Sequence, residues 1–240
     1  PIALNELIPD WKNLDIPIKT KVASEEFTFL TKSKNFTVPN MFLPKDLKNE
    51  GNYIISLGSM CKWLGDYATK LGVDIFPGFT AQKVLYDNNK VKGIITGEKG
   101  LNKSGEKTNL YEPPLALIAK QTIFAEGCRG HLGKEVINKY NLYGKGKFQT
   151  YAIGLKELWE VDNKSFPVGN ILHTIGWPLY NNGYGGSFVY KLSENIVSIG
   201  FVIGLDYKNT YLNPYEEFQR FKTHDKIKNI LKSGKRISYG

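Results

Sequence analysis

Glu126 lies in a short run of residues whose types suit contact with a dinucleotide. It stands in Ala125-Glu126-Gly127, after the apolar pair Ile123-Phe124 and before a predicted helix. A strand that ends in small residues lets a cofactor approach the backbone. The carboxylate can accept hydrogen bonds from sugar hydroxyls, and the first amides of the next helix suit a phosphate. A plain turn between a strand and a helix explains the same residues equally well.

Two adjacent glycines, Gly185 and Gly186, form the second run that suits a ligand. They lie between Tyr184 and Phe188, a few residues after Gly176-Trp177-Pro178-Leu179. Paired glycines leave backbone N–H and C=O groups uncovered beside flat apolar rings, which is what a quinone head group needs. A glycine-rich hairpin turn is the alternative interpretation.

No catalytic side chain and no metal site is predicted. His131, His173 and His224 are too scattered to indicate a triad or a metal centre, and we expect them to be structural or solvent-facing. Cys61 and Cys128 form neither a CxxC pair nor a cluster ligand set. Cys61 is expected to be a small buried hydrophobic residue on a helix.

The elements around these runs alternate between helical and extended patterns. Apolar residues recur at helical spacing from Leu57 to Leu71, ahead of Gly72. Four extended runs follow this helix. A lysine- and glycine-rich surface excursion separates the third run from the fourth, and a second predicted helix, which ends near Tyr140, comes after the fourth. These runs cover residues 73–76, 81–86, 91–96 and 121–127, and the excursion covers residues 99–109.

From Gln149 to Leu205, aromatic and β-branched residues alternate with Gly and Asn, which predicts strands of an antiparallel sheet. Asn213 precedes Pro214 and caps a predicted helix that carries Phe218 and Phe221. The predicted fold class is α+β, or mixed α/β, in two interleaved parts.

The net charge of +9 does not by itself identify a partner. Only Arg129, Arg220 and Arg236 are arginines, whereas lysine is abundant, and this balance does not favour a base-reading surface. We therefore expect no nucleic-acid partner. The longest apolar stretch, Val197–Leu205, is too short to cross a bilayer.

Several separated blocks resemble the electron-transfer flavoprotein:ubiquinone oxidoreductase family, in order and over nearly the whole chain. These blocks are Pro9–Lys12, Gly51–Tyr53, Thr122–Cys128, Gln149–Tyr151, Gly154–Trp159, His173-Thr174, Gly176–Leu179, Tyr184–Phe188, Gly204–Tyr207, Glu217–Arg220, Gly234–Arg236 and Tyr239-Gly240.

This resemblance implies a monotopic flavoenzyme on the matrix side of the mitochondrial inner membrane. Such an enzyme takes electrons from reduced electron-transfer flavoprotein, uses FAD and a 4Fe-4S cluster, and reduces ubiquinone. The ubiquinone contacts carry over onto Gly185 and Gly186. A secondary FAD contact carries over onto Ala125, Glu126 and Gly127.

The chain departs from that family at two places, which predicts an internal fragment. It has no Gly-x-Gly-x-x-Gly turn for the FAD pyrophosphate and no four-cysteine region. We expect the isolated fragment to hold little flavin, to hold no cluster and to be inactive. The predicted segments are residues 1–56 (quinone domain, membrane side), 57–148 (partial FAD domain), 149–232 (ubiquinone-binding domain) and 233–240 (return to the FAD domain).

A quinone with an isoprenoid tail enters from the bilayer, so apolar surface residues are expected to dock on the membrane. The candidates are Ile2, Leu4, Leu7 and Ile8, or the cluster Met41-Phe42-Leu43, with ordinary core packing as the alternative. Two other functions stay open. One is another FAD-dependent enzyme of this architecture, such as a geranylgeranyl reductase or a hydroxylase, and the other is a non-catalytic quinone- or lipid-binding module.

Overall fold

The computed structural model describes residues 1–144, 146, 149–162, 164–179 and 183–240. The chain divides into two compact units. The first comprises Pro1–Leu71 and Gln149–Gly240, and the second comprises Gly72–Phe148. The helix that begins at Leu57 therefore lies in the first unit, although the sequence grouped it with residues 72–148. Phe148, the last residue of the predicted FAD segment, lies outside the described residues.

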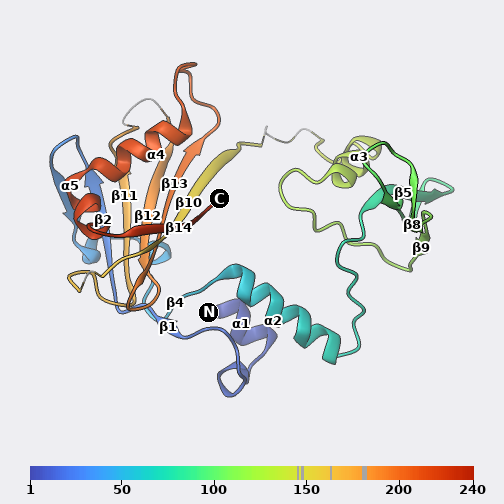
Figure 1. The fold of residues 1–240 in the computed structure, drawn as a ribbon, viewed down its shortest axis with the longest axis horizontal. Coiled ribbons are helices and arrows are strands. Elements are labelled where there is room, and N and C mark those ends of the chain that lie inside the picture. The colour runs from blue at the N-terminus through green and yellow to red at the C-terminus, as the bar shows by residue number, and fades with distance from the viewer. Residues whose placement is uncertain (145, 147–148, 163, 180–182) are drawn as a thin grey trace. The chain divides into compact units, whose positions relative to one another are not determined.

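A seven-stranded sheet dominates the first unit (Figure 1). Strands β10 to β13 pair antiparallel, as the alternating pattern of residues 149–205 predicted. Strands β3 and β14 also pair antiparallel with their neighbours, whereas β2 pairs in parallel with β11. The residues after Gly234 form the edge strand β14 of this sheet. The strand order is β14 (Lys235–Tyr239), β10 (Ala152–Glu160), β13 (Ile196–Gly204), β12 (Gly185–Lys191), β11 (Asn170–Gly176), β2 (Ser24–Leu30) and β3 (Asn35–Val38).

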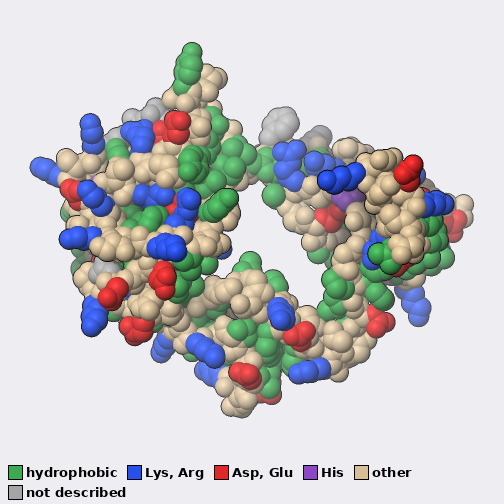
Figure 2. Space-filling model, in the orientation of Figure 1, with side chains coloured by type: hydrophobic (Ala, Val, Ile, Leu, Met, Phe, Trp, Pro, Cys, Tyr) green, Lys and Arg blue, Asp and Glu red, His purple; other side chains and the backbone are tan. Residues whose placement is uncertain are grey.

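Two helices, α4 (Pro214–Thr223) and α5 (Asp225–Ile230), cover one face of this sheet. Helix α4 begins as predicted, because the Asn213 side chain accepts the amides of Tyr215 and Glu216 while Pro214 occupies the first turn. Lysine and arginine side chains gather over α4, α5 and β14 on the face seen in Figure 2.

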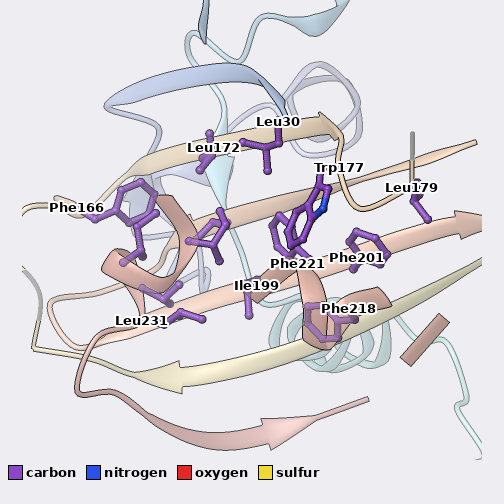
Figure 3. Close-up of a cluster of buried hydrophobic side chains, with 14 of the residues drawn as sticks. Leu30, Phe166, Leu172, Trp177, Leu179, Ile199, Phe201, Phe218, Phe221 and Leu231 are labelled. Atoms are coloured by element: carbon purple, nitrogen blue, oxygen red, sulfur yellow. The ribbon is translucent and has the colours of Figure 1, made fainter. Parts of the chain in front are cut away.

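The main core lies between these helices and the sheet (Figure 3). Phe201 on β13 stacks against both Phe218 and Phe221 of α4, with ring centroids 6.0 and 5.5 Å apart. Apolar residues of the strands point toward the helices and form most of this face, which also carries the buried Glu157. Burial of these rings joins helix and sheet into one cooperative body.

The N-terminal segments build a smaller core from α1 (Ile2–Leu7), the 3₁₀ turn Trp11–Asn13 and α2 (Leu57–Lys70). Two further 3₁₀ turns and a two-stranded ladder complete this part. These are Asn40–Phe42 and Lys45–Leu47, and β1 (Thr20–Lys21) with β4 (Tyr53–Ile54).

Helix α2 forms where the periodicity predicted it, but the prediction that Cys61 is buried is wrong. The inward positions are Met60, Trp63, Leu64 and Tyr67, which follow the spacing i, i+3, i+4, i+7. Cys61 lies one residue beyond Met60, about 100° around the helix, and is exposed.

In the second unit, β5 (Ala81–Asp87) and β6 (Lys90–Thr96) form the predicted hairpin, with Asn88 and Asn89 at positive φ in the turn. The predicted surface excursion is itself a hairpin. Its strands are β7 (Lys99–Leu101) and β8 (Lys107–Glu112), and β9 (Ala116–Ile118) completes the sheet beside β6. Helix α3 (His131–Lys139) matches the predicted helix and packs on β5.

Two predicted strands do not form. Residues 73–76 and 121–127 are irregular, and Ile123 is 84% exposed. A strand requires a hydrogen-bonded neighbour, and the only three-stranded sheet described in this unit, β5-β6-β9, includes neither segment. Apolar composition alone therefore gave the wrong secondary structure at both places. Within the described ranges, no helix has both the length and the apolar content for crossing a bilayer.

Candidate functional site

Gly185 and Gly186 open strand β12, opposite Ile203 and Val202 of β13. A Cβ atom at Gly185 would overlap the carbonyl oxygen of Val202, and one at Gly186 would lie 2.7 Å from the carbonyl oxygen of Thr174. The glycines are therefore required by close strand packing. Both residues belong to the sheet, so the alternative interpretation of a glycine-rich hairpin turn does not hold.

The backbone of Gly185 is directed differently from that of Gly186. The amide of Gly204 donates to the carbonyl of Tyr184, which fixes the alternation of the β12–β13 ladder. Gly186 therefore faces β13, whereas the N–H and C=O of Gly185 face the side of β11. The described β11–β12 pairs end at Thr174–Ser187.

Beyond that last pair, β11 turns away from β12. The carbonyl of Gly176 accepts the amide of Leu179, and the amide of Trp177 donates to Leu30 on β2. The backbone of Gly185 thus lies just beyond the last described hydrogen-bonded pair between β11 and β12. It is next in sequence to Tyr184, which is 80% exposed. Trp177, in contrast, is buried in the core and lies against His224, so its ring does not flank the glycines.

His173 lies on the sheet face opposite the helices, with its Nε2 atom 2.8 Å from the hydroxyl of Tyr190. Burial lowers the pKa of His173, and the negative charge of Glu25 opposes that shift. Its ladder partner is Phe188, and Tyr190 lies on the far side of Phe188 from Gly186. The imidazole therefore bonds away from the glycine pair.

The other two histidines have local structural roles. The ring of His224 is buried and its Nδ1 accepts the amide of Lys226 at the start of α5. His131 is exposed, and its Nε2 lies 2.8 Å from the carbonyl oxygen of Ala81. The hydrogen bonds described for these two rings run to backbone groups, and that of His173 runs to a tyrosine, so none of them joins two histidines.

The carboxylate of Glu126 folds onto the first turn of α3. Its oxygens accept the amides of Leu132 and Gly133 at 3.3 and 2.6 Å. The amides that we expected to be available for a phosphate are thus already bonded within the chain. Gly127 has a φ of 77° and no neighbour within 4 Å of a Cβ position, so a ligand can still approach there. The residues fit a secondary sugar contact and do not fit a phosphate cradle.

The iron–sulfur cluster that the family resemblance implies is not matched by ligands in this chain. A 4Fe-4S cluster takes four thiolates, whereas Cys61 and Cys128 are the only cysteines and belong to different units. No group of three or more His, Cys, Asp or Glu side chains suited to a metal is found over the described ranges.

Glu157, which no sequence motif marked as a site residue, is the centre of a buried ion network. Its carboxylate accepts bonds from Lys222 of α4, Arg236 of β14 and the indole N–H of Trp159. Burial alone would raise the pKa of Glu157, but these donors hold it below its ordinary value. The available signal was the inward alternation of Leu155, Glu157 and Trp159, which places an acid in the core.

Solved structures with this arrangement define the class of fold. The flavin-dependent brominase Bmp2 aligns with 99% of this chain and 52% of its own, with a TM-score of 0.61 and 15% identity. A geranylgeranyl bacteriochlorophyll reductase-like protein from Thermoplasma acidophilum aligns with 92% of this chain and 49% of its own, with a TM-score of 0.63 and 16% identity. The chain thus has part of a fold that occurs in flavin-dependent enzymes.

Sequence comparison then identifies the family. Residues 151–240 match the model "ETF-QO, ubiquinone-binding". All of the chain aligns at 49% identity with 44% of the electron transfer flavoprotein-ubiquinone oxidoreductase of Pseudomonas aeruginosa. It also aligns at 47% identity with 39% of the human mitochondrial protein of that name. The chain belongs to the electron transfer flavoprotein-ubiquinone oxidoreductase family, and it spans less than half the length of these relatives.

Proposed function

We propose that the protein passes electrons from reduced electron-transfer flavoprotein through FAD to ubiquinone, and that this chain supplies the ubiquinone-binding sheet. The observation that carries the proposal is the match of residues 151–240 to the ubiquinone-binding family model. Those residues contain β10 to β14, and so they include the open end of β12. A 4Fe-4S cluster would need ligands from outside this chain.

The quinone head group is proposed to bind at Gly185 and Gly186. The N–H of Gly185 is the donor for one quinone carbonyl, because it faces the side on which the β11–β12 ladder ends. Exposed apolar groups beside it, Tyr184 and Ile175, give the ring a surface to pack on. His173 lies on the strand next to the glycine pair and is a candidate for proton delivery to the reduced quinone. Because its Nε2 is bonded to Tyr190, on the side away from the glycines, the proton would have to pass through water.

FAD, when bound, takes up and passes on the electrons. We propose that Ala125, Glu126 and Gly127 make a secondary contact with its sugar. The supporting geometry is the open space at Gly127 and the two carboxylate oxygens of Glu126, each of which keeps acceptor capacity beyond one amide.

Attachment to a membrane surface, without a spanning helix, is proposed to use exposed apolar residues. Met41 and Phe42 are 78% and 71% exposed, and Ile2 and Leu7 are 79% and 71% exposed. Leu43 and Ile8 are buried, so these two candidates pack inside the fold instead. The mitochondrial names of several relatives support a mitochondrial location, whereas the Pseudomonas relative is bacterial. The matrix side of the inner membrane is proposed from the family resemblance alone.

The test is photolabelling of the full-length protein with an azido-ubiquinone analogue, followed by peptide mapping and a quinone reductase assay. We expect label near Tyr184–Gly186, removed by excess ubiquinone. Gly186→Ala should raise KM for quinone, because its Cβ would meet the Thr174 carbonyl. Gly154→Ala on neighbouring β10 is the control, since its Cβ would have ordinary contacts only.

Label confined to other peptides, or an unchanged KM in Gly186→Ala, would place the quinone elsewhere. Turnover that requires NAD(P)H and oxygen rather than electron-transfer flavoprotein would instead favour a hydroxylase of the same fold. Quinone binding with no turnover by flavin-loaded full-length protein would favour a non-catalytic binding module.

A further inference from the structure

A surface pocket of about 800 Å³ lies on the helix-covered side of the first unit, away from the glycine pair. It is formed where α4, the end of α5 and strand β10 meet. Three of its lining residues are lysines, and no Asp or Glu is among the described residues that line it. The lining residues are Trp159, Gln219, Lys222, Thr223, Lys228, Asn229, Leu231, Lys232 and Ser233.

The charge of this pocket is only partly compensated. Lys222 is bonded to both oxygens of Glu157, at 2.9 and 2.8 Å, and is neutralised there. Lys228 and Lys232 are exposed, four residues apart and without an ion-pair partner among the described residues. Like charges at this spacing repel each other, and an anion between them relieves that repulsion.

The side-chain amide of Gln219 is a second, independent observation that points to a ligand. Its Nε2 atom is buried and has no hydrogen-bond partner among the residues that the structure describes. Buried amide donors are normally satisfied, because leaving one unpaired is unfavourable. Because Gln219 is one of the residues that line the pocket, we infer that an acceptor bound there can pair with this amide after a small rotation of the side chain.

The donors available are of the kind that binds phosphate oxygens. Lys222 has three N–H groups, two of which are directed to Glu157, so one is left for a ligand. Lys228 and Lys232 supply further cationic donors, and Gln219 supplies a neutral one. Trp159 and Leu231 give the pocket an apolar wall. Figure 2 shows the lysine- and arginine-rich surface over α4 and α5 to which this pocket belongs.

We propose that this pocket is an anion site that binds a phosphate group through Lys228, Lys232 and the Nε2 of Gln219. Free phosphate and the phosphate of a lipid head group share this chemistry. A lipid source would add a contact between the protein and an anionic bilayer, on a surface separate from the exposed Met41 and Phe42.

The first experiment titrates inorganic phosphate into the full-length protein at constant ionic strength, with the melting temperature and tryptophan fluorescence as readouts. Phosphate should stabilise the protein, and Lys228→Gln/Lys232→Gln should weaken its binding roughly tenfold. The control Lys45→Gln/Lys48→Gln makes the same change in charge at the start of a 3₁₀ turn and at the residue after it, neither of which lines the pocket, and should bind phosphate normally.

Gln219→Leu gives a second signature that a damaged fold does not produce. It removes an unpartnered buried amide, so the phosphate-free protein should melt at the same or a higher temperature, while the shift on adding phosphate becomes smaller. A phosphate response that is absent in the parent protein, or equal in parent, lysine-pair and Gln219→Leu proteins, would overturn the proposal.

Flotation with vesicles that contain phosphatidylglycerol, compared with vesicles of phosphatidylcholine alone, distinguishes the two sources. Flotation on the anionic vesicles that falls in Lys228→Gln/Lys232→Gln supports a lipid phosphate. Flotation that is unaffected by this substitution, together with a phosphate response that depends on the lysine pair, supports a soluble phosphate ligand.

Discussion

The Nζ atom of Lys222 on α4 lies 2.8 Å from a carboxylate oxygen of Glu157 on β10, in a contact that is nearly closed to water. Arg236 on β14 bonds to the other oxygen, so one carboxylate on β10 connects a helix and the edge strand. Since each partner is satisfied only while all three elements are docked, this network couples their folding.

Replacement of Glu157 by Gln should therefore destabilise the protein by about 3 kcal/mol, because it leaves the shielded ammonium of Lys222 without its counter-charge. Urea unfolding followed by tryptophan fluorescence measures the change. Glu217→Gln is the matched control. Its partner Arg220 is half-exposed, so the expected loss is below about 1 kcal/mol. Equal losses in the two variants would contradict the proposed importance of burial.

The same carboxylate predicts a loss of stability in acid. Because the pKa of Glu157 is lower in the folded than in the unfolded protein, its contribution is fully present above the unfolded value, near 4.3. The contribution is lost as pH falls through the folded pKa. Unfolding free energies measured between pH 6 and pH 3 should fall less steeply in Glu157→Gln than in the parent. Parallel curves would show that other groups dominate.

His173 predicts a second pH dependence, at higher pH. Burial lowers the pKa of the folded imidazole, so the unfolded chain binds more protons below the ordinary value near 6.5. Stability should therefore rise as pH increases to about 7, and His173→Gln should flatten that rise. His131→Gln is the control, because His131 is exposed. If the rise of stability with pH persists in His173→Gln and is lost in His131→Gln, the group responsible for it is His131 and not His173.

Lys191 is a buried cation whose replacement should be tolerated. It is 1% exposed, and its ammonium has no hydrogen-bond partner within the described part of the chain. Burial lowers its pKa, and the charges of Glu194 and Asp162 oppose that shift. Lys191→Met keeps the length of the side chain and removes the charge. We expect it to be neutral or stabilising by about 1 kcal/mol at pH 7 in urea unfolding.

The advantage of Lys191→Met should shrink as pH rises toward the unfolded lysine pKa, because the folded parent loses its charge first. The control Lys191→Ala opens a cavity and should be destabilising. A clear loss of stability in Lys191→Met at pH 7 would mean that the ammonium has a favourable partner in solution.

Local pattern predicted those elements whose formation depends on nearby residues. Helix α2 follows from periodicity, the β5–β6 hairpin from its Asn turn, and the start of α4 from Asn213 and Pro214. Strands β10 to β13 follow from alternation, and the blocks that resemble the family extend along the chain as the comparisons found. In each case the determining contacts lie within a few residues or repeat with a fixed period.

Only the tertiary structure decided which residues of a helix or strand are buried and which groups they bond to, because burial and pairing depend on elements distant in sequence. Residues 121–127 have strand composition but no described ladder partner, and Cys61 sits beside the inward face of α2 rather than on it. Glu126 reaches the amides of α3, and Glu157 finds Lys222 65 residues away. The sequence alone determined the family and most local elements, whereas which polar groups are available to a ligand depended on hydrogen bonds made across the fold.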